Sequence, residues 1–157
     1  MLTTEEMIFR LCVAIVLGAI IGIEREYVGK EAGIRTDIMV AAGAALFSMV
    51  SVVLPYIIAP SPSDIPDIIA RNSGFLGVIA NVVVGVGFLG AGVIIKHEGR
   101  VYGLTTAAAV WFVAAIGVLA GVGLVKFACI ATAFLVILLV LLRQFDIMRF
   151  FGKKQEE

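Results

Sequence analysis

Long runs of apolar residues, separated by short charged segments, constrain this chain more than any other feature of its sequence. A helix needs roughly 20 apolar residues to cross a bilayer, where only helices and closed barrels satisfy their backbone groups. The runs are continuous and do not alternate as barrel strands would, which favours helices. With 61% hydrophobic and 15% charged residues, the composition excludes an ordinary soluble domain. We therefore predict an all-α polytopic membrane bundle of five transmembrane helices, at residues 7–23, 38–59, 75–95, 104–121 and 124–142.

The predicted spans form one membrane domain, residues 1–145, followed by a short charged tail, residues 146–157. Between residues 101 and 142 the only charged side chain is that of Lys126. Because this stretch is too long for a single span, we expect a break at Gly121-Val-Gly123, with Lys126 at the surface.

Positive charges are distributed unevenly over the predicted loops. Loops rich in Lys and Arg stay in the cytoplasm. Five spans place nine cations on one face and three on the other. The first set is Arg25, Lys30, Arg35, Lys96, Arg100, Arg143, Arg149, Lys153 and Lys154, and the second is Arg10, Arg71 and Lys126. We therefore expect the C-terminus in the cytoplasm and the N-terminus outside.

Two segments of the chain share one pattern. Residues 22–36 align without gaps with residues 92–106, an offset of 70. Gly22, Gly29, Gly33 and Thr36 recur as Gly92, Gly99, Gly103 and Thr106. Chance is the alternative, since the chain has 17 glycines. Because the charge count places both segments on one face, we predict two parallel hairpin repeats with an axis near the membrane normal.

Glycines recur where helices are expected to approach one another. Lipid removes the hydrophobic drive between helices, so close van der Waals contact must replace it. The glycines assigned to such contacts are Gly18, Gly22, Gly85, Gly87, Gly90, Gly92, Gly117 and Gly121. Residues 85–92 hold four of them, so we expect this segment at the centre of the bundle. It lacks the preceding strand and the Lys-Ser/Thr ending of a phosphate-binding loop.

Polar and ionisable residues gather at the ends of the first, second and fourth predicted spans. Such groups are costly in a membrane unless they are paired or hydrated. We predict that they converge in a polar site near the cytoplasmic surface. Its members are Glu24, Arg25, Arg35, Thr36, Asp37, Thr105 and Thr106. The acids would suit a cation such as Mg²⁺, and the helix ends and arginines an anion, so the sequence leaves the ligand open.

These residues also have structural interpretations. Acids and bases four residues apart pair on a helical turn, and Thr or Asp side chains cap helix N-termini. The pairs would be Glu26–Lys30 and Glu31–Arg35, and the caps Thr36 or Asp37 for the second span and Thr105 or Thr106 for the fourth. Asn81, inside the third span, is expected to bond a neighbouring helix, with a place in a polar cavity as the alternative.

Nothing in the sequence indicates an enzyme. Cys12 and Cys129 lie inside apolar runs, no C-x-x-C occurs, and His97 is the single histidine. These residues support neither a zinc site, a disulfide framework nor a nucleophile–base pair. The net charge of zero and the lack of a basic cluster give no reason to expect nucleic acid. We expect no catalytic residues and no cofactor.

Four short phrases stand out along the chain. They are Gly-Ile-Glu-Arg at 22–25, Ala-Gly-Ile-Arg-Thr at 32–36, Gly-Phe-Leu-Gly-Ala-Gly at 87–92 and Gly-Leu-Thr-Thr-Ala-Ala at 103–108. In this order and spacing, over roughly residues 8–125, they resemble the membrane domain of the MgtC/SapB family. The resemblance implies a multi-pass protein of a bacterial or archaeal plasma membrane. It also implies a link to growth in low magnesium, acid resistance and survival inside host cells.

The resemblance also implies a mode of action, although this sequence departs from the family in two ways. It points to restraint of the F-type ATP synthase instead of magnesium transport, with the family's polar residues falling on Glu24, Arg25, Arg35, Thr36, Thr105 and Thr106. Many members place an Asp and an Arg shortly before the third span, where this chain reads Gly74-Phe-Leu-Gly77. Long members also carry a soluble C-terminal domain, and we expect a short member without it.

Two functions follow from this sequence. A regulator of a membrane partner would keep its polar groups near the cytoplasmic surface. A small-ion transporter or channel would need Asn81, Thr106 and the acids of the first loop to line one connected cavity. We favour the regulator, because the third to fifth spans hold so little charge. Thin, glycine-rich helices offer more small-residue faces than one bundle uses, so we also expect a homodimer.

Overall fold

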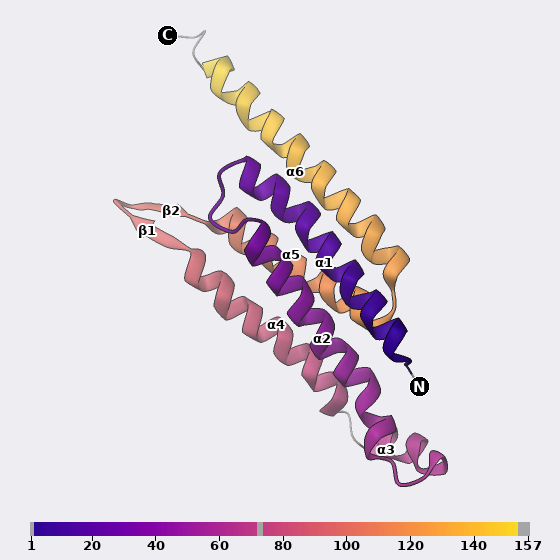
Figure 1. The fold of residues 1–157 in the computed structure, drawn as a ribbon. Coiled ribbons are helices and arrows are strands. Elements are labelled where there is room, and N and C mark those ends of the chain that lie inside the picture. Colours follow the sequence, from indigo (N-terminus) through magenta and orange to yellow (C-terminus); the bar gives the residue numbers. More distant parts are fainter. Residues whose placement is uncertain (1, 72–73, 154–157) are drawn as a thin grey trace.

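The computed structural model describes residues 2–71 and 74–153, with the backbone alone at residues 71, 74–76 and 145–153. The described chain is a bundle of helices with one short β hairpin (Figure 1). The elements are α1 (Thr4–Tyr27), α2 (Ile34–Ile58), the 3-10 turn η1 (Pro62–Asp64), α3 (Ile65–Arg71), α4 (Gly74–Val93), β1 (Ile95–His97), β2 (Arg100–Tyr102), α5 (Leu104–Val122) and α6 (Val125–Lys153). The predicted all-helical architecture is confirmed, apart from the hairpin.

Four of the described helices are long and apolar enough to cross a membrane. They are α1, α2, α5 and the Val125–Gln144 part of α6. The expected third span falls on α4 (Gly74–Val93), and the part of it whose side chains the structure describes, Gly77–Val93, is shorter. The count of five spans therefore stays a prediction, as does the duplication of the two hairpins.

Local sequence signals explain where several helices begin and end. Thr3 caps α1, because its Oγ1 accepts a hydrogen bond from the backbone N–H of Glu6 at 3.2 Å. The expected break in the last long apolar stretch is confirmed. Helix α5 ends at Val122, and Gly123 takes the left-handed conformation with φ of 98°. Lys126 is exposed, as predicted.

The core of the bundle lies between α1, α2 and α5. Ile21 from α1, Ala41 from α2 and Ile116 from α5 are fully buried together. A Cβ atom added to Gly117 would lie 2.3 Å from the backbone oxygen of Ala41, so the two backbones are in direct contact. Gly121 meets Ala45 in the same way one turn further on. Helices α2 and α5 therefore run parallel, in contact along their small residues.

Helix α4 lies at the edge of the bundle, so the central position expected for its glycines is wrong for a single chain. Gly90 approaches Ala107 of α5, with 3.5 Å between an added Cβ and that side chain. A Cβ added to Gly85, Gly87 or Gly92 would meet no described atom within 4 Å. Within the described chain, α4 packs on α2 and α5, and Gly85, Gly87 and Gly92 lie in open space.

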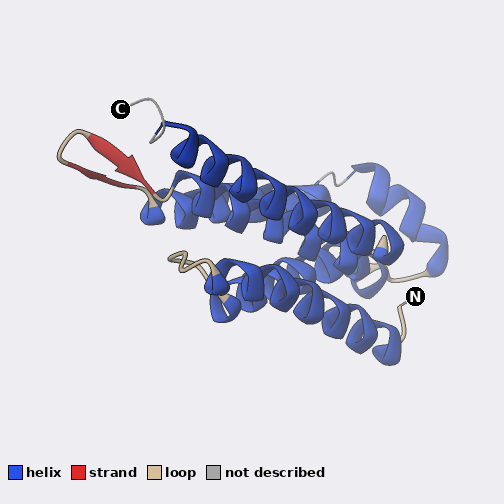
Figure 2. Ribbon diagram, turned by 90° about the horizontal axis from the view of Figure 1, so that it is seen from above, coloured by secondary structure: helices blue, strands red, loops and turns tan. Residues whose placement is uncertain are grey.

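The two loops that share the repeat pattern lie at the same end of the bundle, together with the end of α6 (Figure 1). Their structures differ. The first loop folds against the helices, and Ala32 in it is buried. The second forms the hairpin of β1 and β2, which extends beyond the helices (Figure 2). Glu98 and Gly99, both with positive φ, make its two-residue turn.

The remaining segments complete the two ends of the bundle. The proline-rich loop at the other end contains η1 and α3, so it is not the plain loop that composition alone would allow. Helix α6 continues without a break to Lys153, well past its apolar part. The tail expected at residues 146–157 therefore begins inside this helix, and residues 154–157 lie outside the described chain.

Candidate functional site

The close approach of α1 and α2 brings two charged residues into the interior. A Cβ added to Gly18 would lie 2.7 Å from the backbone oxygen of Asp37, and one added to Gly22 would lie 2.6 Å from Cα of Ile34. Because these glycines carry no side chain, the first turn of α2 lies directly against α1. Asp37 is consequently 1% exposed and Arg25 is 4% exposed, although both are ionisable.

The buried charges are only partly paired. Arg25 Nε donates a hydrogen bond to Glu24 Oε2 at 2.7 Å, and Arg25 also acts electrostatically on Asp37. Among the described residues, Glu24 Oε1, Arg25 Nη1 and both carboxyl oxygens of Asp37 have no hydrogen-bond partner. Buried polar atoms are normally bonded, so this concentration marks the site. We call Glu24, Arg25 and Asp37 the buried charge cluster.

A second polar contact joins the two loop ends. Thr106 Oγ1 donates a hydrogen bond to Glu31 Oε2 at 2.6 Å, across 75 residues of sequence. Thr106 is buried, and its hydrogen bond is the main cause that lowers the pKa of Glu31 below the ordinary value. The bond fastens the first loop to the first turn of α5. We call it the Glu31–Thr106 latch.

The N-termini of α2 and α5 are not capped by the residues expected from the sequence. Gly33 and Gly103 occupy the two N-cap positions, neither with a side-chain hydrogen bond. At α2, the backbone N–H of Ile34 donates to Glu26 Oε2 at 3.0 Å. The expected caps Thr36, Asp37, Thr105 and Thr106 are therefore wrong. Glu26 bonds the start of α2 and Glu31 bonds α5, where the sequence suggested pairs with Lys30 and Arg35.

The structure gathers some of the predicted polar residues and separates others. Glu24, Arg25 and Asp37 form the cluster, and Thr106 closes the latch beside it. Arg35 and Thr105 are exposed, and Thr36 is half-buried. Asn81 lies on a different helix, α4, and is also exposed.

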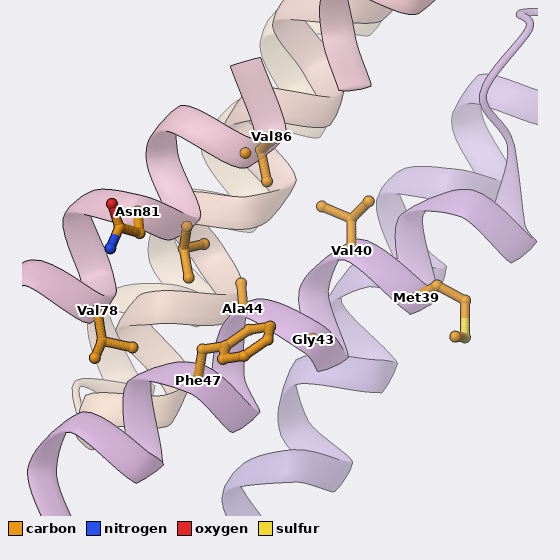
Figure 3. A pocket seen from close by; sticks show the side chains of 10 residues that line it. Met39, Val40, Gly43, Ala44, Phe47, Val78, Asn81 and Val86 are labelled. Atoms are coloured by element: carbon orange, nitrogen blue, oxygen red, sulfur yellow. The ribbon is translucent and has the colours of Figure 1, made fainter. Parts of the chain in front are cut away.

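Asn81 lines an apolar groove between α2 and α4 (Figure 3). The groove has a volume of about 460 Å³. Val40, Ala44 and Phe47 of α2 form one side of it, and Val78 and Asn81 of α4 stand on the other. None of the cluster residues lines this groove. We expected Asn81 to bond a neighbouring helix, but its side chain is exposed at this groove.

The positions of two further polar residues, Arg10 and Thr132, were not predicted. Arg10 Nη1 donates to the backbone oxygen of Gly121 at 2.9 Å, and its Nη2 pairs with Glu6. It thereby ties α1 to the end of α5. Thr132 of α6 is buried, and its Oγ1 has no partner in the described part of the chain. An isolated threonine in an apolar run was the only sequence signal for it.

The described residues offer little to a metal ion. They contain no group of three or more His, Cys, Asp or Glu side chains placed to share one. The cluster supplies two carboxylates next to a guanidinium, whereas Ca²⁺ and Mg²⁺ take six or more oxygen ligands.

Comparisons with known proteins agree with the resemblance seen in the sequence. The model of the MgtC family matches residues 11–148. The chain is 41% identical to Protein MgtC of Brucella abortus over 130 residues, which are 83% of this chain and 48% of that protein. It is 43% identical to Protein MgtC of Salmonella typhimurium over 137 residues, which are 87% of this chain and 52% of that protein.

An uncharacterized protein of Synechocystis is also similar, at 41% identity over 139 residues, or 88% of this chain and 53% of that protein. The chain thus spans about half the length of the curated relatives it matches. No solved structure matches it.

Proposed function

Because this chain belongs to the MgtC family, we propose that it is a multi-pass plasma-membrane protein of ion homeostasis and stress adaptation, acting on a membrane partner. The relevant ion is magnesium, the host is a bacterium or an archaeon, and the F-type ATP synthase is the partner we would test first. We propose no enzymatic activity. This function builds on the membership and on two features of the bundle.

The single observation that carries the regulator proposal is the separation of the polar groups. A transporter needs Asn81 and the buried charge cluster in one connected cavity. Asn81 instead lines a groove whose other residues are apolar apart from backbone atoms, and no member of the cluster borders it. The polar groups of the cluster and latch stay at the loop end of the bundle. Because no polar path joins Asn81 to the cluster in the described part of the chain, action through a partner is the better-supported function.

The outward face of α4 fits a transmembrane helix of that partner. Gly85 and Gly92, seven residues apart and therefore on the same side of the helix, have open space in place of a side chain, as far as the described residues go. Phe88 beside them is 85% exposed and Val84 is 71% exposed. Small residues let helix backbones approach closely in lipid, and Asn81 in the adjoining groove offers an amide for an interhelical hydrogen bond. We propose that a helix of the partner lies along this face.

A membrane pull-down with a matched control tests this proposal. Tagged protein carrying Gly85→Leu should lose at least tenfold of the ATP synthase that the parent retains, because the leucine occupies the contact surface. Ala133→Leu, at an exposed small residue of α6, should retain the synthase. Equal retention by the parent and Gly85→Leu would count against this face. Loss of a second tagged copy, with the synthase unaffected, would identify the face as the interface of the expected homodimer.

The orientation is also a proposal, supported by the nine cations assigned to the loop end and tail. In a variant without Cys12 and Cys129, a cysteine in place of Gly99 should react with an impermeant maleimide only after cells are opened. A cysteine in place of Ser63 should react in intact cells. The reverse labelling pattern would show that the protein has the opposite orientation in the membrane.

The alternative is a small-ion transporter or channel, and the unpaired atoms of the buried charge cluster are the observation in its favour. Flux of Mg²⁺, Na⁺ or protons into liposomes holding the purified protein tests it. Robust flux that disappears in a Glu24→Ala/Asp37→Ala double variant would displace the regulator proposal. No flux under any gradient would remove the transporter.

A further inference from the structure

The side chain of Asp37 stands in an environment that does not suit a charged carboxylate. It is 1% exposed, and both of its oxygens lack a hydrogen-bond partner among the described residues. A buried carboxylate is stable when it is paired and hydrogen-bonded, and it otherwise takes up a proton and becomes neutral. The geometry of Asp37 meets the condition for the second outcome.

The neighbouring charges do not supply the missing partner. Arg25 acts electrostatically on Asp37, but its Nε is bonded to Glu24, and its Nη1 is left without a partner in the described chain. Two acids therefore share one base, which leaves one negative charge in the interior. One bound proton would neutralise it while Glu24 and Arg25 remain an ion pair.

The other described helices against α2 are α3, α4 and α5, and α3, whose sequence contains Asp67 and Arg71, lies at the opposite end of the bundle from Asp37 (Figure 1). Helices α4 and α5 contain no ionisable side chain in their sequences. In the first loop, Glu31 is bonded to Thr106, and Glu26 accepts from the backbone of Ile34. At the same end, Arg143 of α6 lies over the ring of Tyr27, 5.8 Å from its centroid.

We propose that Asp37 is a proton-binding site, holding a neutral carboxyl group beside the Glu24–Arg25 ion pair at neutral pH. The reaction is the uptake of one proton from water by the Asp37 carboxylate, with no other bond formed or broken. A divalent cation is the poorer ligand, because the guanidinium of Arg25 lies beside the two carboxylates and the oxygen ligands are too few. This site goes beyond the proposed function and holds for whichever partner the protein regulates.

Infrared spectroscopy of the purified full chain in lipid tests the proposal directly. A protonated carboxyl group has a C=O stretch that is separate from the bands of carboxylates and amides. We expect this band in the parent protein at neutral pH and its loss in Asp37→Asn, which keeps the shape of the side chain. Asp67→Asn, at an exposed aspartate of α3, is the matched control and should keep the band.

Two further measurements keep the test independent of how the variant folds. Carboxyl-¹³C-labelled aspartate should shift the band in the parent protein, and an unshifted band would overturn the assignment to Asp37. A parent protein with no neutral-carboxyl band at neutral pH would overturn the proposal outright. Loss of the band on addition of Mg²⁺ at constant pH would also overturn it, because the site would then be a metal site.

Discussion

The direct backbone contact between α2 and α5 leaves no room for a side chain at Gly117. A Cβ added there would lie 2.3 Å from the backbone oxygen of Ala41, whereas ordinary contacts of this kind begin at 3.4 Å. Gly117→Ala therefore requires the helices to separate by about 1.1 Å, the difference between these distances. The obstructing atom belongs to a helix backbone and cannot rotate away. We therefore expect destabilisation near the upper end of the overpacking range, about 3 kcal/mol.

Gly43→Ala is the matched control for this prediction. Gly43 also lies inside a helix, α2, but a Cβ there would meet no described atom within 4 Å. Alanine favours a helix over glycine by about 1 kcal/mol, so this variant should be slightly more stable than the parent. The helix preference is common to both substitutions and cancels in their comparison. The two unfolding constants should then differ about 100-fold.

The assay is unfolding of the detergent-solubilised protein by sodium dodecyl sulfate, followed by circular dichroism. Gly117→Ala should unfold at a clearly lower denaturant fraction than Gly43→Ala, and Gly121→Ala should resemble Gly117→Ala because an added Cβ there would lie 2.5 Å from the backbone oxygen of Ala45. If Gly117→Ala and Gly43→Ala unfold within about 0.5 kcal/mol of each other, the α2–α5 contact does not hold the bundle together.

Three further substitutions test the polar contacts and the hairpin. Thr106→Val should remove the latch. The folded-state pKa of Glu31 is lowered, so the latch stabilises the protein above the ordinary pKa of a glutamate. This stabilisation is lost as the pH falls through the lowered pKa. Melting temperatures measured from about pH 7 to about pH 3 should therefore depend less on acid in the variant than in the parent. Arg10→Gln should lower the stability of the protein by about 1 kcal/mol, because the hydrogen bond to Gly121 is lost. Amide hydrogens at the end of α5 should then exchange faster. Unchanged exchange would contradict the role given to Arg10. Gly99 has a φ of 78°, so Gly99→Ala should weaken the hairpin by about 1 kcal/mol and speed amide exchange at residues 95–102. The melting midpoint of the protein should not change, because the hairpin is exposed. A lowered midpoint would show that the hairpin supports the bundle.

Local signals in the sequence were enough to predict most of the helices. Apolar runs and charge boundaries depend on residues close together in the chain, and helix formation inside a membrane depends on the same residues. Gly123 shows this well, because a glycine between two apolar runs is itself the reason that α5 can end there. The family resemblance was likewise carried by short phrases and is confirmed by the comparisons.

The errors concern contacts between distant segments. The glycines of α4 indicate that another helix can approach, but not whether that helix belongs to the same chain, so their outward face was not foreseen. Thr106 offers a hydroxyl equally to a helix end and to a passing loop, and only the fold brings Glu31 to it. The pairing of Glu24 with Arg25 and the burial of Asp37 depend in the same way on how closely α1 and α2 approach.

The unbroken course of α6 has a mechanical consequence. From Arg143, the first charged residue after Lys126, the helix continues for ten residues to Lys153, or about 15 Å at the rise of an α-helix. A continuous helix resists bending, so this extension moves as one piece with the rest of α6. A small tilt of α6 against α1 and α5 would become a larger sideways displacement at its tip. A group bound to the end of this extension would therefore move together with the bundle.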